Sequence, residues 1–562
     1  MRSQTKLVVF FTAALLLVVS GPVSTFAANG WQKESGTWFS YDKNGKLETE
    51  KWEKFGDNWF YLKDDGRMAV DEIIESNGEC YYVDENGSMV TNKWVSVQNV
   101  DYNGEDVEGP ANYWYYFGSA GKAYHGSGSS VSFKTIKGKK YIFDEEGKML
   151  YGWINASGQR ENGDDAWRNG MYYCGDENNG MQSIGWIQLE ITDNEWDDAN
   201  REPGNSSENI YNDESQNRWF YFKGNGKKMA DEDGKTINGK KYSFDKDGRM
   251  NVEWVNWDAT PQIATVSSPN YARGFRYYGS PEDGARITKG WFQVVPDSYL
   301  KLKDYDDDKS NWYYADKDGK LVVLELKTIS GKKYGFDKFG AMLQGVMFLK
   351  LGADNKSIVA IQKSDTSKVP DVVLPEAEES TDYTFDSPYS FKQNVSSWEA
   401  SGYKLYCFDR DGSMQTVKKS ISLDGDLFTF LFKKSGSNKG TGKTGIDNKK
   451  YYQSGMLMAA TKEEKYAVIK ITKDNHSISY IQFLTTSEFL DWIEAENDIT
   501  NEKKYIEDYH VEQLVTQNKN IEYKLVDISG TIQKNKRKAK DGEGYCYEVS
   551  KNGTIVRVFV EN

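Results

Sequence analysis

The sequence predicts an all-β protein, built as a solenoid of repeated β-hairpins, with a divergent C-terminal region that has room for a small α+β element. Three nearly identical phrases begin at Lys134, Lys235 and Lys327: "KTIKGKKYIFDEEGKM", "KTINGKKYSFDKDGRM" and "KTISGKKYGFDKFGAM". Aromatic residues make up 14% of the chain, with 37 Tyr and 17 Trp, and the mean hydropathy is −0.74. Such a chain lacks the aliphatic residues for large cores. Its rings must therefore pack, bind, or both, within hairpins that stack on their neighbours.

The first 27 residues have the architecture of a secretory signal peptide. Arg2 and Lys6 precede an apolar run from Leu7 to Val19, and small residues follow as far as Ala27. The run is shorter than the roughly 20 residues that a membrane-spanning helix needs. We therefore expect cleavage after Ala27, a secreted chain, and no membrane span once the signal is removed.

Each repeat is expected to form a β-hairpin of about 20 residues. Examples are "WFSYDKNGKL" from Trp38, "WFYLKDDGRM" from Trp59 and "WYYFGSAGKA" from Trp114. Each phrase has a few β-forming residues, then an acidic or polar turn with Gly, then a second short strand. Gly accepts a positive φ and Asp caps the backbone, so the pair favours a tight turn. The sequence therefore places the hairpin turn at this Asp–Gly segment.

A second Trp follows many of these phrases, usually directly after Gly. Gly-Trp occurs at residues 152–153, 185–186 and 290–291, and Trp52, Trp94 and Trp254 follow Lys or Glu instead. A small residue beside a large ring permits close approach between successive hairpins. The hairpins form triplets of a "WYYF", a "GKKY" and a "YYG" phrase. Long acidic stretches, such as "ITDNEWDDANREPGNSSENIYNDESQNR", are expected to be exposed insertions between hairpins.

Together, these features resemble the cell-wall-binding repeats of Gram-positive bacteria, the choline-binding family. Glucan-binding repeats and clostridial toxin repeats are more distant relatives of the same hairpin type. The resemblance covers residues 28–345. It implies a non-enzymatic protein, attached non-covalently to the cell wall, that binds teichoic acid choline or a related glycan polymer through aromatic cages. A host glycan or protein partner stays open.

The resemblance also implies which rings form the cages. A strand Trp, the Trp of the Gly-Trp pair and a Tyr from the neighbouring hairpin would surround each ligand. The expected members are Trp38, Trp52, Trp59, Tyr61, Trp94, Trp114, Tyr116, Trp153, Tyr173, Trp186, Trp219, Tyr221, Trp254, Tyr278, Trp291, Trp312 and Tyr314. Three departures lower the number of cages: Met171 and Arg276 take the place of a first Trp, and Val346 that of a Gly-Trp ring.

The repeat pattern weakens in the last third of the chain. Residues 346–402 are expected to hold a loop or linker and one divergent repeat. Residues 403–562 are expected to hold divergent hairpins, among them "YKLYCFDRDGSM" from Tyr403, with a helical cap near residues 460–520. Four cysteines stand inside aromatic strand phrases, where they resemble small apolar residues. We expect these to stay free thiols: Cys80, Cys174, Cys407 and Cys546.

Signals for catalysis, metals and nucleic acid are weak. A net charge of −14 disfavours nucleic acid and anionic membranes. "GTGKTG" from Gly440 has Ser437 where a phosphate-binding loop needs Gly. "DYDDDKS" has calcium-loop spacing but lacks the required Gly and Glu. We therefore expect no catalytic residues, no metal and no cofactor. Two alternatives stay open: a glycan-binding adhesin, and an enzyme within residues 346–562. About half of the rings would be hairpin core in any case.

Overall fold

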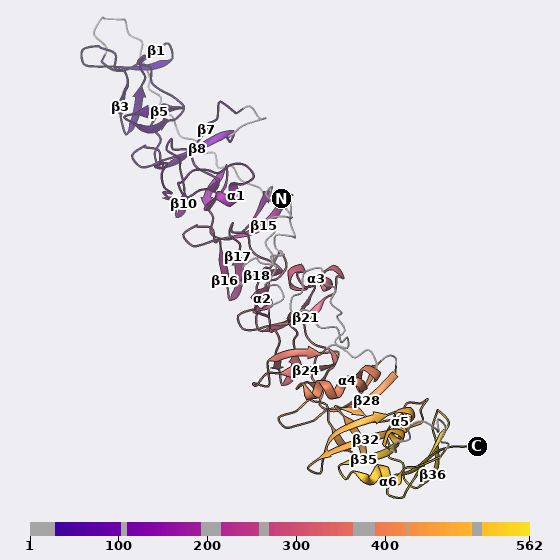
Figure 1. Cartoon of the computed structure of the whole chain (residues 1–562). Helices are drawn as coiled ribbons and strands as arrows, with labels where there is room; N and C mark the ends of the chain where they lie inside the picture. The colour runs from indigo at the N-terminus through magenta and orange to yellow at the C-terminus, as the bar shows by residue number, and fades with distance from the viewer. Residues whose placement is uncertain are drawn as a thin grey trace, which may run out of the picture. The chain divides into compact units, whose positions relative to one another are not determined.

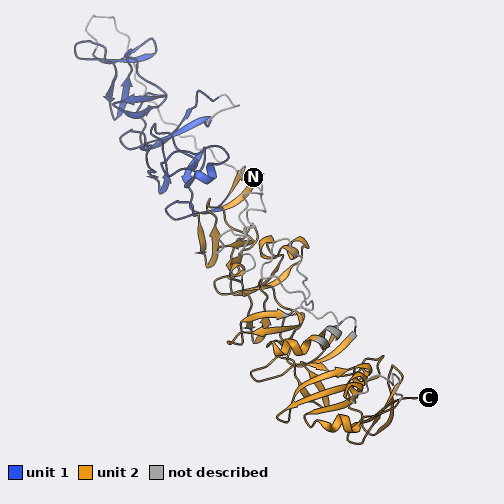
Figure 2. Cartoon of the chain, viewed as in Figure 1, with its two compact units in different colours: residues 1–188, 220–229 blue, residues 189–219, 230–562 orange. Residues whose placement is uncertain are grey.

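The computed structural model describes residues 29–102, 109–192, 215–257, 269–362, 388–423, 426–496 and 508–561 (Figure 1). The predicted fold class is confirmed, because the described strands form small antiparallel sheets, most of which pair two consecutive strands. The chain divides into two compact units, residues 1–188 with 220–229 and residues 189–219 with 230–562 (Figure 2). The predicted signal peptide, residues 1–27, lies outside the described residues. The domain boundaries predicted near residues 345 and 402 stay predictions.

The described residues of unit 1 form mostly hairpins, together with one short helix. Its elements are β1 (Gly30–Glu34), β2 (Thr37–Tyr41), β3 (Lys51–Phe55), β4 (Asn58–Leu62), β5 (Glu72–Ser76), β6 (Glu79–Val83), β7 (Lys93–Gln98), β8 (Asn112–Phe117), β9 (Lys134–Ile136), β10 (Lys139–Tyr141), β11 (Gly152–Ile154), α1 (Ala166–Asn169), β12 (Tyr172–Asp176) and β13 (Asn179–Gln182). Two further strands have residues in both units: β14 (Gly185–Thr192) and β15 (Ser215–Phe222).

Unit 2 continues the hairpins and adds larger sheets. Its first elements are β16 (Glu232–Ile237), β17 (Lys240–Phe244), β18 (Trp254–Asn256), α2 (Pro269–Gly274), β19 (Phe275–Tyr277), β20 (Gly290–Val294), α3 (Ser298–Asp306), β21 (Asn311–Ala315), β22 (Leu326–Ile329), β23 (Lys332–Gly335), β24 (Gly345–Leu351), β25 (Ile358–Gln362), α4 (Pro388–Ala400) and β26 (Lys404–Phe408). Its last elements are β27 (Lys418–Leu423), β28 (Asp426–Leu431), β29 (Gly445–Asp447), β30 (Lys450–Gln453), β31 (Met456–Leu457), β32 (Tyr466–Asp474), β33 (Ser477–Leu484), α5 (Thr486–Glu496), β34 (Asp508–His510), α6 (Glu512–Gln517), β35 (Ile521–Asp527), β36 (Lys536–Lys540), β37 (Tyr545–Val549) and β38 (Ile555–Val560).

The predicted position of the hairpin turn is wrong. The two long strands of a repeat meet earlier, across a residue followed by Gly, as in β9–β10, where Ile136 pairs with Lys139. Lys137 and Gly138 between them both have positive φ, 48° and 81°. Two positive φ values in a two-residue loop suit the right-handed twist of the flanking strands. The "KG", "NG" and "SG" steps of the three repeated phrases are therefore the hairpin turns.

The Asp–Gly segment makes a second turn, which closes only a single bridge. The Asp42 Oδ1 atom accepts hydrogen bonds from the Asn44 and Lys46 N–H groups, both at 2.8 Å. One bridge then joins Tyr41 to Leu47. The Glu48 N–H still donates to the Ser40 carbonyl of this strand at 2.9 Å, whereas the Glu50 N–H donates to the Lys63 carbonyl of the next hairpin at 3.2 Å.

The residue after this turn ties each hairpin to the one before it. The Met68 N–H donates to the Trp38 carbonyl at 2.9 Å, and the Met89 N–H donates to the Trp59 carbonyl at 2.8 Å. The Gly of the turn makes room for the preceding Met, since a Cβ on Gly87 would lie 2.6 Å from the Met68 Cε atom. Gly87 also has a φ of 79°, which other residues adopt at a cost. Stacking therefore requires both the backbone bond and the glycine.

In most repeats, one residue at or near the end of the aromatic strand forms the inner core. At this position the side chain is at most 1% exposed in each of the following cases: Leu62, Val83, Phe117, Phe143, Cys174, Phe222, Phe244, Tyr278, Ala315, Phe336 and Phe408. Burial of such a side chain typically contributes about 1.5–3 kcal/mol. Successive side chains of a strand point to opposite faces. The ring two residues before this core residue therefore lies on the same face as the core residue.

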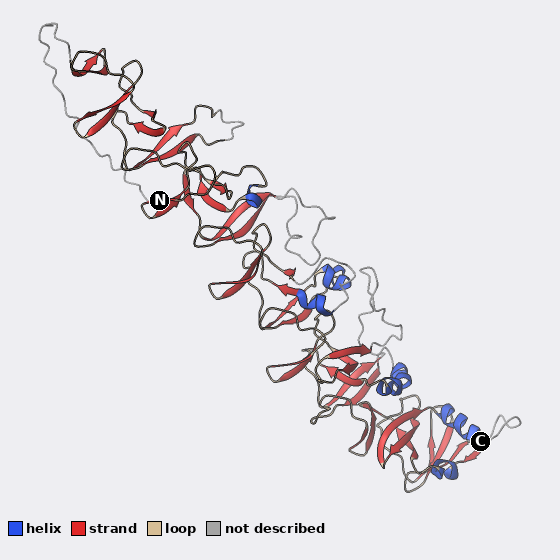
Figure 3. Cartoon of the chain, turned by 60° about the vertical axis from the view of Figure 1, so that its left-hand side comes forward, coloured by secondary structure: helices blue, strands red, loops and turns tan. Residues whose placement is uncertain are grey.

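The insertions lie inside hairpins rather than between them, which corrects the prediction. The helix α3 falls between the paired strands β20 and β21, and α2 falls between β18 and β19. The long acidic stretch predicted as an exposed insertion between hairpins begins in β14 and ends in β15, and its residues 193–214 lie outside the described part. Of the described helices, drawn in blue in Figure 3, α1 belongs to unit 1 and α2 to α6 belong to unit 2.

The C-terminal part of unit 2 has the expected α+β character. The helix α5 buries Phe489 and Ile493 in a core that includes residues of β32, β35 and β38. The Tyr403 phrase is not a hairpin of its own, because its strand β26 pairs with β24, and Cys407 lies opposite Val346. The Pro-rich linker at residues 364–382 lies outside the described residues. Among the helices that the structure describes, none combines the length and apolar character that crossing a bilayer requires.

Candidate ligand-binding site

A Trp and a Tyr face each other across the two strands of most repeats. The Trp that follows Gly, Lys or Glu belongs to the first strand, and the Tyr lies opposite on the aromatic strand, as Trp94 lies opposite Tyr116. The ring centroids are 5.0–5.2 Å apart, with edge-to-face geometry, in these pairs: Trp52–Tyr61, Trp94–Tyr116, Trp153–Tyr173, Trp186–Tyr221, Trp254–Tyr277 and Trp291–Tyr314. The predicted Trp and Tyr partners are therefore brought together, although within one hairpin.

The next hairpin supplies a third ring to several pairs. Tyr81 lies 5.1 Å from Trp52, Tyr141 lies 4.9 Å from Trp94, and Tyr334 lies 4.8 Å from Trp291, measured between centroids. We call these three groups the ring clusters of Trp52, Trp94 and Trp291. The sequence predicted a Tyr from the neighbour but did not identify it. In each case this Tyr stands two residues before a buried inner-core residue, namely Val83, Phe143 or Phe336.

The ring clusters differ in how much of their Tyr rings they leave accessible. The Trp side chains at positions 52, 94 and 291 are half-buried. The rings of Tyr61, Tyr81, Tyr314 and Tyr334 are also half-buried, whereas Tyr116 and Tyr141 are buried. The clusters of Trp52 and Trp291 therefore present the most accessible ring surface among these three.

Two other predicted cage members are enclosed. Trp153 is 8% exposed, and the Lys228 ammonium lies 5.3 Å from its ring centroid. Trp254 is 2% exposed and donates its Nε1–H to the Val295 carbonyl at 2.8 Å. An internal ammonium occupies the face of Trp153 where a ligand cation would bind, because ring faces attract cations within about 6 Å. These two rings serve the core.

The alignment of the phrase near Arg276 was one residue out of register. Val255 pairs with Arg276, and Asn256 pairs with Phe275, so Phe275 rather than Arg276 replaces the first Trp. Tyr277 therefore faces Trp254, and the predicted ligand residue Tyr278 falls at the inner core position, 0% exposed. The Tyr278 hydroxyl accepts from the Arg286 Nη2 group at 2.8 Å. A slip of one residue moves every side chain to the opposite face of a strand.

The first Trp of each aromatic strand lies nearer the surface. Trp59 and Trp312 are each 40% exposed. Trp38, Trp114 and Trp219 are half-buried. Trp312 lies 6.4 Å from Trp291 at an interplanar angle of 82°. The ring cluster of Trp291 therefore has a fourth ring at its edge.

The ring series ends where the sequence predicted an interruption. Val346 stands in register with the Gly-Trp rings, and its partner across the strands is Cys407 rather than Tyr. Both side chains belong to an aliphatic and aromatic core. The four cysteines are free thiols on separate strands, β6, β12, β26 and β37. Burial raises the pKa of Cys174 and of Cys407 to about 12, which keeps both thiols protonated and unreactive at neutral pH.

Negative charge lies close to the ring cluster of Trp52. Burial, and then the Glu50 and Asp64 carboxylates, raise the pKa of Tyr61. The Trp52 Nε1–H is buried and has no acceptor within the described part of the chain. A cluster of this kind offers ring faces and a negative field to a cation, together with one free donor for an acceptor atom.

The weak sequence signals have structural explanations. The buried Asp304 carboxylate pairs with the Lys301 ammonium at 2.6 Å and accepts from Asn311 at 2.7 Å. The segment after "GTGKTG" is the strand β29 rather than a helix. Within the residues that the structure describes, no group of three or more His, Cys, Asp or Glu side chains is arranged to hold a metal.

The fold and the ring clusters define a hairpin-repeat protein whose hairpins present partly accessible aromatic clusters. Comparison with protein families makes the class specific. Residues 49–94 match the choline-binding repeat, and residues 306–321 match the cell wall binding repeat. The chain therefore carries repeats of the choline-binding type. The ring cluster of Trp52, with Tyr61 and Tyr81, lies entirely inside the first of these matches.

A curated relative is glucosyltransferase-S from Streptococcus mutans, 26% identical over 269 residues. The match covers 41% of this chain but only 16% of the relative, so the chain spans a small part of that protein's length.

Solved structures of Streptococcus pneumoniae proteins are also similar. Choline binding protein F, solved with a peptidoglycan analogue, is 18% identical, covers 70% of this chain and 98% of its own, and has a TM-score of 0.34. The modular autolysin LytC, solved with a synthetic peptidoglycan ligand, is 19% identical, covers 58% of this chain and 56% of its own, and has a TM-score of 0.29.

Proposed function

We propose that this chain is an exported, non-enzymatic surface protein that binds choline on cell-wall teichoic acid through its ring clusters. The observation that carries the proposal is the ring cluster of Trp52, which has accessible rings, nearby carboxylates and a position inside a choline-binding repeat. The clusters of Trp94 and Trp291 repeat its geometry. Attachment to the wall is non-covalent in this proposal, and secretion follows from the predicted signal peptide.

The chemistry of choline matches such a cluster. A quaternary ammonium has no hydrogen-bond donor, so ring faces and negative charge are what can hold it. Each ring contact contributes about 0.5–2 kcal/mol. One cluster would therefore bind weakly, and several clusters on one polymer would bind with avidity. This is why a repeat chain suits a polymer with repeated choline groups.

Retention on a quaternary-amine resin tests the proposal. The full chain should be retained and should elute with free choline. The double variant Trp52→Ala/Trp291→Ala should elute earlier, because two accessible clusters are lost. The variant Phe55→Ala is the matched control, because Phe55 is an aromatic ring that is 53% exposed at a hairpin tip and belongs to none of the ring clusters. Unchanged retention of the double variant would refute the assignment. N-terminal sequencing of the secreted protein should begin at Ala28.

A second candidate function is glycan binding. The Nε1–H groups of Trp52 and Trp114 are buried without an acceptor in the described residues, and sugar hydroxyls could accept from such donors. The match to glucosyltransferase-S is consistent with this candidate but leaves it a proposal. Retention on a glucan matrix that free choline fails to reverse would favour glycan binding over choline. Catalysis by residues 346–562 would require turnover of a wall polymer, which we expect to be absent.

A further inference from the structure

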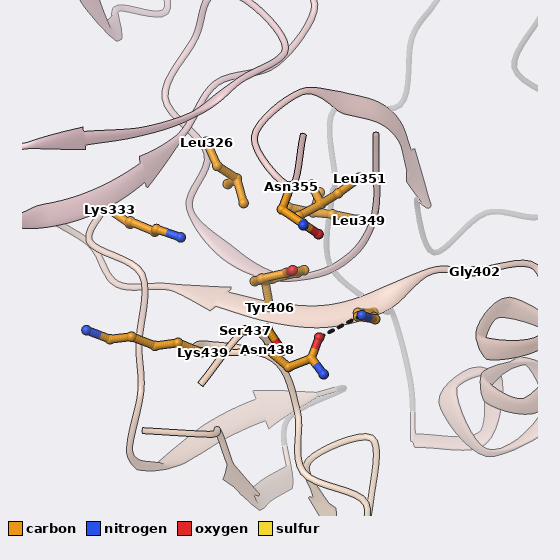
Figure 4. A pocket seen from close by; sticks show the side chains of 11 residues that line it. Leu326, Lys333, Leu349, Leu351, Asn355, Gly402, Tyr406, Ser437, Asn438 and Lys439 are labelled. Carbon is orange, nitrogen blue, oxygen red and sulfur yellow. Dashed lines mark hydrogen bonds between the residues drawn. The ribbon is translucent and has the colours of Figure 1, made fainter. Parts of the chain in front are cut away.

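A small pocket in unit 2 lies apart from the ring clusters, between the hairpin β22–β23, the sheet of β24 and β26, and the loop before β29 (Figure 4). Its volume is about 90 Å³, which is about three times the share of one water molecule in the liquid. Leu326 and Leu349 belong to its lining and are buried in the core. The pocket therefore has a fixed apolar wall and has room for one small group.

One buried polar group faces this space. Tyr406 is 4% exposed and packs with Leu349 and Phe408, while its side chain also lines the pocket. Figure 4 shows it between Leu326 and Asn355 on one side and Asn438 on the other. The hydroxyl has no hydrogen-bond partner among the described residues. Burial raises the pKa of Tyr406 to about 12, so the hydroxyl keeps its proton at neutral pH and can donate it.

The charged groups around the pocket are positive. Lys333, Lys404 and Lys439 line it, in a chain whose net charge is −14. In Figure 4, the Lys333 side chain extends toward Tyr406, whereas the Lys439 side chain points away from it. The Lys404 ammonium donates to the Asn438 Oδ1 atom at 2.8 Å, the dashed line in Figure 4. Within the described part of the chain, no carboxylate is paired with any of these three lysines.

The nearest acidic side chain of the adjoining turn is already engaged. The Asp354 carboxylate accepts from the Lys356 and Ser357 N–H groups at 3.0 and 2.9 Å and from the Ser357 hydroxyl at 2.6 Å. These hydrogen bonds, with that of the Ser357 hydroxyl the strongest, lower the pKa of Asp354 to about 2. Its charge is held within its own turn, so Asn355 presents a neutral amide to the pocket.

The loop that carries Asn438 and Lys439 is anchored to the fold. The Lys433 N–H donates to the Thr441 carbonyl at 2.9 Å, and the Gly442 N–H donates to the Leu405 carbonyl at 2.8 Å. The Thr441 hydroxyl donates to the Asn438 carbonyl at 2.8 Å. These bonds fix the loop against β26, so the polar groups of the pocket are pre-organised and little entropy is lost when a ligand binds.

We propose that this pocket binds the phosphate group of a phosphate ester. A tetrahedral oxyanion fits the volume and accepts hydrogen bonds from several directions. The pocket offers it the Lys333 and Lys404 ammonium groups, the buried Tyr406 phenol and the side-chain amides of Asn355 and Asn438. A carbohydrate hydroxyl would leave the lysines without a counter-charge, and a quaternary ammonium would be repelled by them. The proposal is independent of choline binding by the ring clusters.

Calorimetric titration of the full chain tests this site, at constant ionic strength and in a buffer without phosphate. The probes are inorganic phosphate and dimethyl phosphate, which represent a free phosphate and a phosphodiester. At least one probe should show saturable binding, and their relative affinity identifies the source. Lys333→Gln should weaken binding about tenfold, because it removes the ammonium that extends toward Tyr406. Tyr406→Phe should weaken it about threefold while preserving the ring in the core.

Lys332→Gln is the matched control, because the Lys332 ammonium is paired with Asp411 at 3.0 Å instead of lining the pocket. It should bind phosphate like the unmodified chain. Saturating choline should also leave phosphate affinity unchanged, which separates this site from the ring clusters. The proposal is overturned if neither probe binds saturably, or if Lys333→Gln and Lys332→Gln bind equally well.

Discussion

Trp254 and Trp291 belong to consecutive hairpins of unit 2 and begin from the same local arrangement. Each lies opposite a Tyr on the paired strand, at centroid distances of 5.0 and 5.1 Å. Trp254 is nevertheless 2% exposed, whereas Trp291 is half-buried. The repeat motif alone therefore does not determine whether the first-strand Trp of a hairpin lies in the core or at the surface.

The insertions account for the difference. Trp254 belongs to a core that includes Tyr271 and Ala272 of α2 and Leu300 of α3. Trp291 packs with Val322, Ile329 and Phe336, which come from strands and turns. A helix inserted at a hairpin tip thus converts a partly accessible ring surface into core. In unit 1, Trp167 of α1 is likewise buried, and its carbonyl binds the lysine that lies over Trp153.

Replacing Trp254 should have the largest effect on stability. Trp254→Ala removes a fully buried ring, and such changes typically lower the free energy of unfolding by about 3–5 kcal/mol. Denaturant unfolding of the full chain measures this loss. Trp291→Ala should lower it by clearly less, because half of that ring is already in water. Equal losses for the two variants would contradict the division into core and surface rings.

The buried ion pair that anchors α3 should matter next. Burial alone would raise the pKa of Asp304, but the Lys301 hydrogen bond and charge more than offset this and lower it overall. A lowered carboxyl pKa stabilises the fold above its unfolded value of about 3.9, and that contribution is lost as the pH falls through the folded pKa.

Asp304→Asn should therefore destabilise the chain at pH 7 by about 1–3 kcal/mol, since a buried ammonium loses its counter-charge. The difference from the unmodified chain should shrink below pH 4. Unfolding measured at pH 7 and pH 3 checks both parts. A constant difference across this range would show that Asp304 acts without its charge.

Replacing Trp291 should have a moderate effect, on binding. Loss of one ring from a cation site costs about 0.5–2 kcal/mol, which corresponds to an affinity about 2- to 30-fold lower at that cluster. Choline titration followed by calorimetry measures the change. Phe55→Ala serves again as the matched control. A substitution at Trp254, such as Trp254→Gln, is unsuitable for this purpose because it disturbs the core. A choline isotherm of Trp291→Ala that superimposes on the unmodified one would place this ring in the core with Trp254.

The smallest effect is expected at the third ring. Tyr334→Phe keeps the ring 4.8 Å from Trp291 and removes only the hydroxyl. Choline affinity should stay within about twofold, because ring faces and not hydroxyl groups hold a quaternary ammonium. Tyr334→Ala should weaken binding by more. A large loss in Tyr334→Phe would favour a hydroxyl-bearing ligand, such as a sugar, over choline.

The sequence was sufficient to predict the hairpin class, the triplets and the interruption at Val346, since these follow from repeated local patterns. It misplaced the hairpin turn because the Asp–Gly segment and the residue–Gly step are both turn signals, and only hydrogen bonding between hairpins shows which one closes the long strands. It misassigned Tyr278 because two adjacent tyrosines leave the face of the strand undecided. The third rings and the cover over Trp254 depend on packing between separate segments, which a local pattern does not encode.

The backbone bond from each turn to the preceding hairpin has a consequence for how the repeats assemble. Met89 bonds to Trp59, and Met149 bonds to Trp114, so each link spans only a few tens of residues. Stability in such an array is a sum of unit and nearest-neighbour terms, and folding can nucleate at one repeat and propagate outward. The links run in one direction, from each repeat to its predecessor. As the chain emerges during synthesis, every new hairpin therefore finds its docking partner already made.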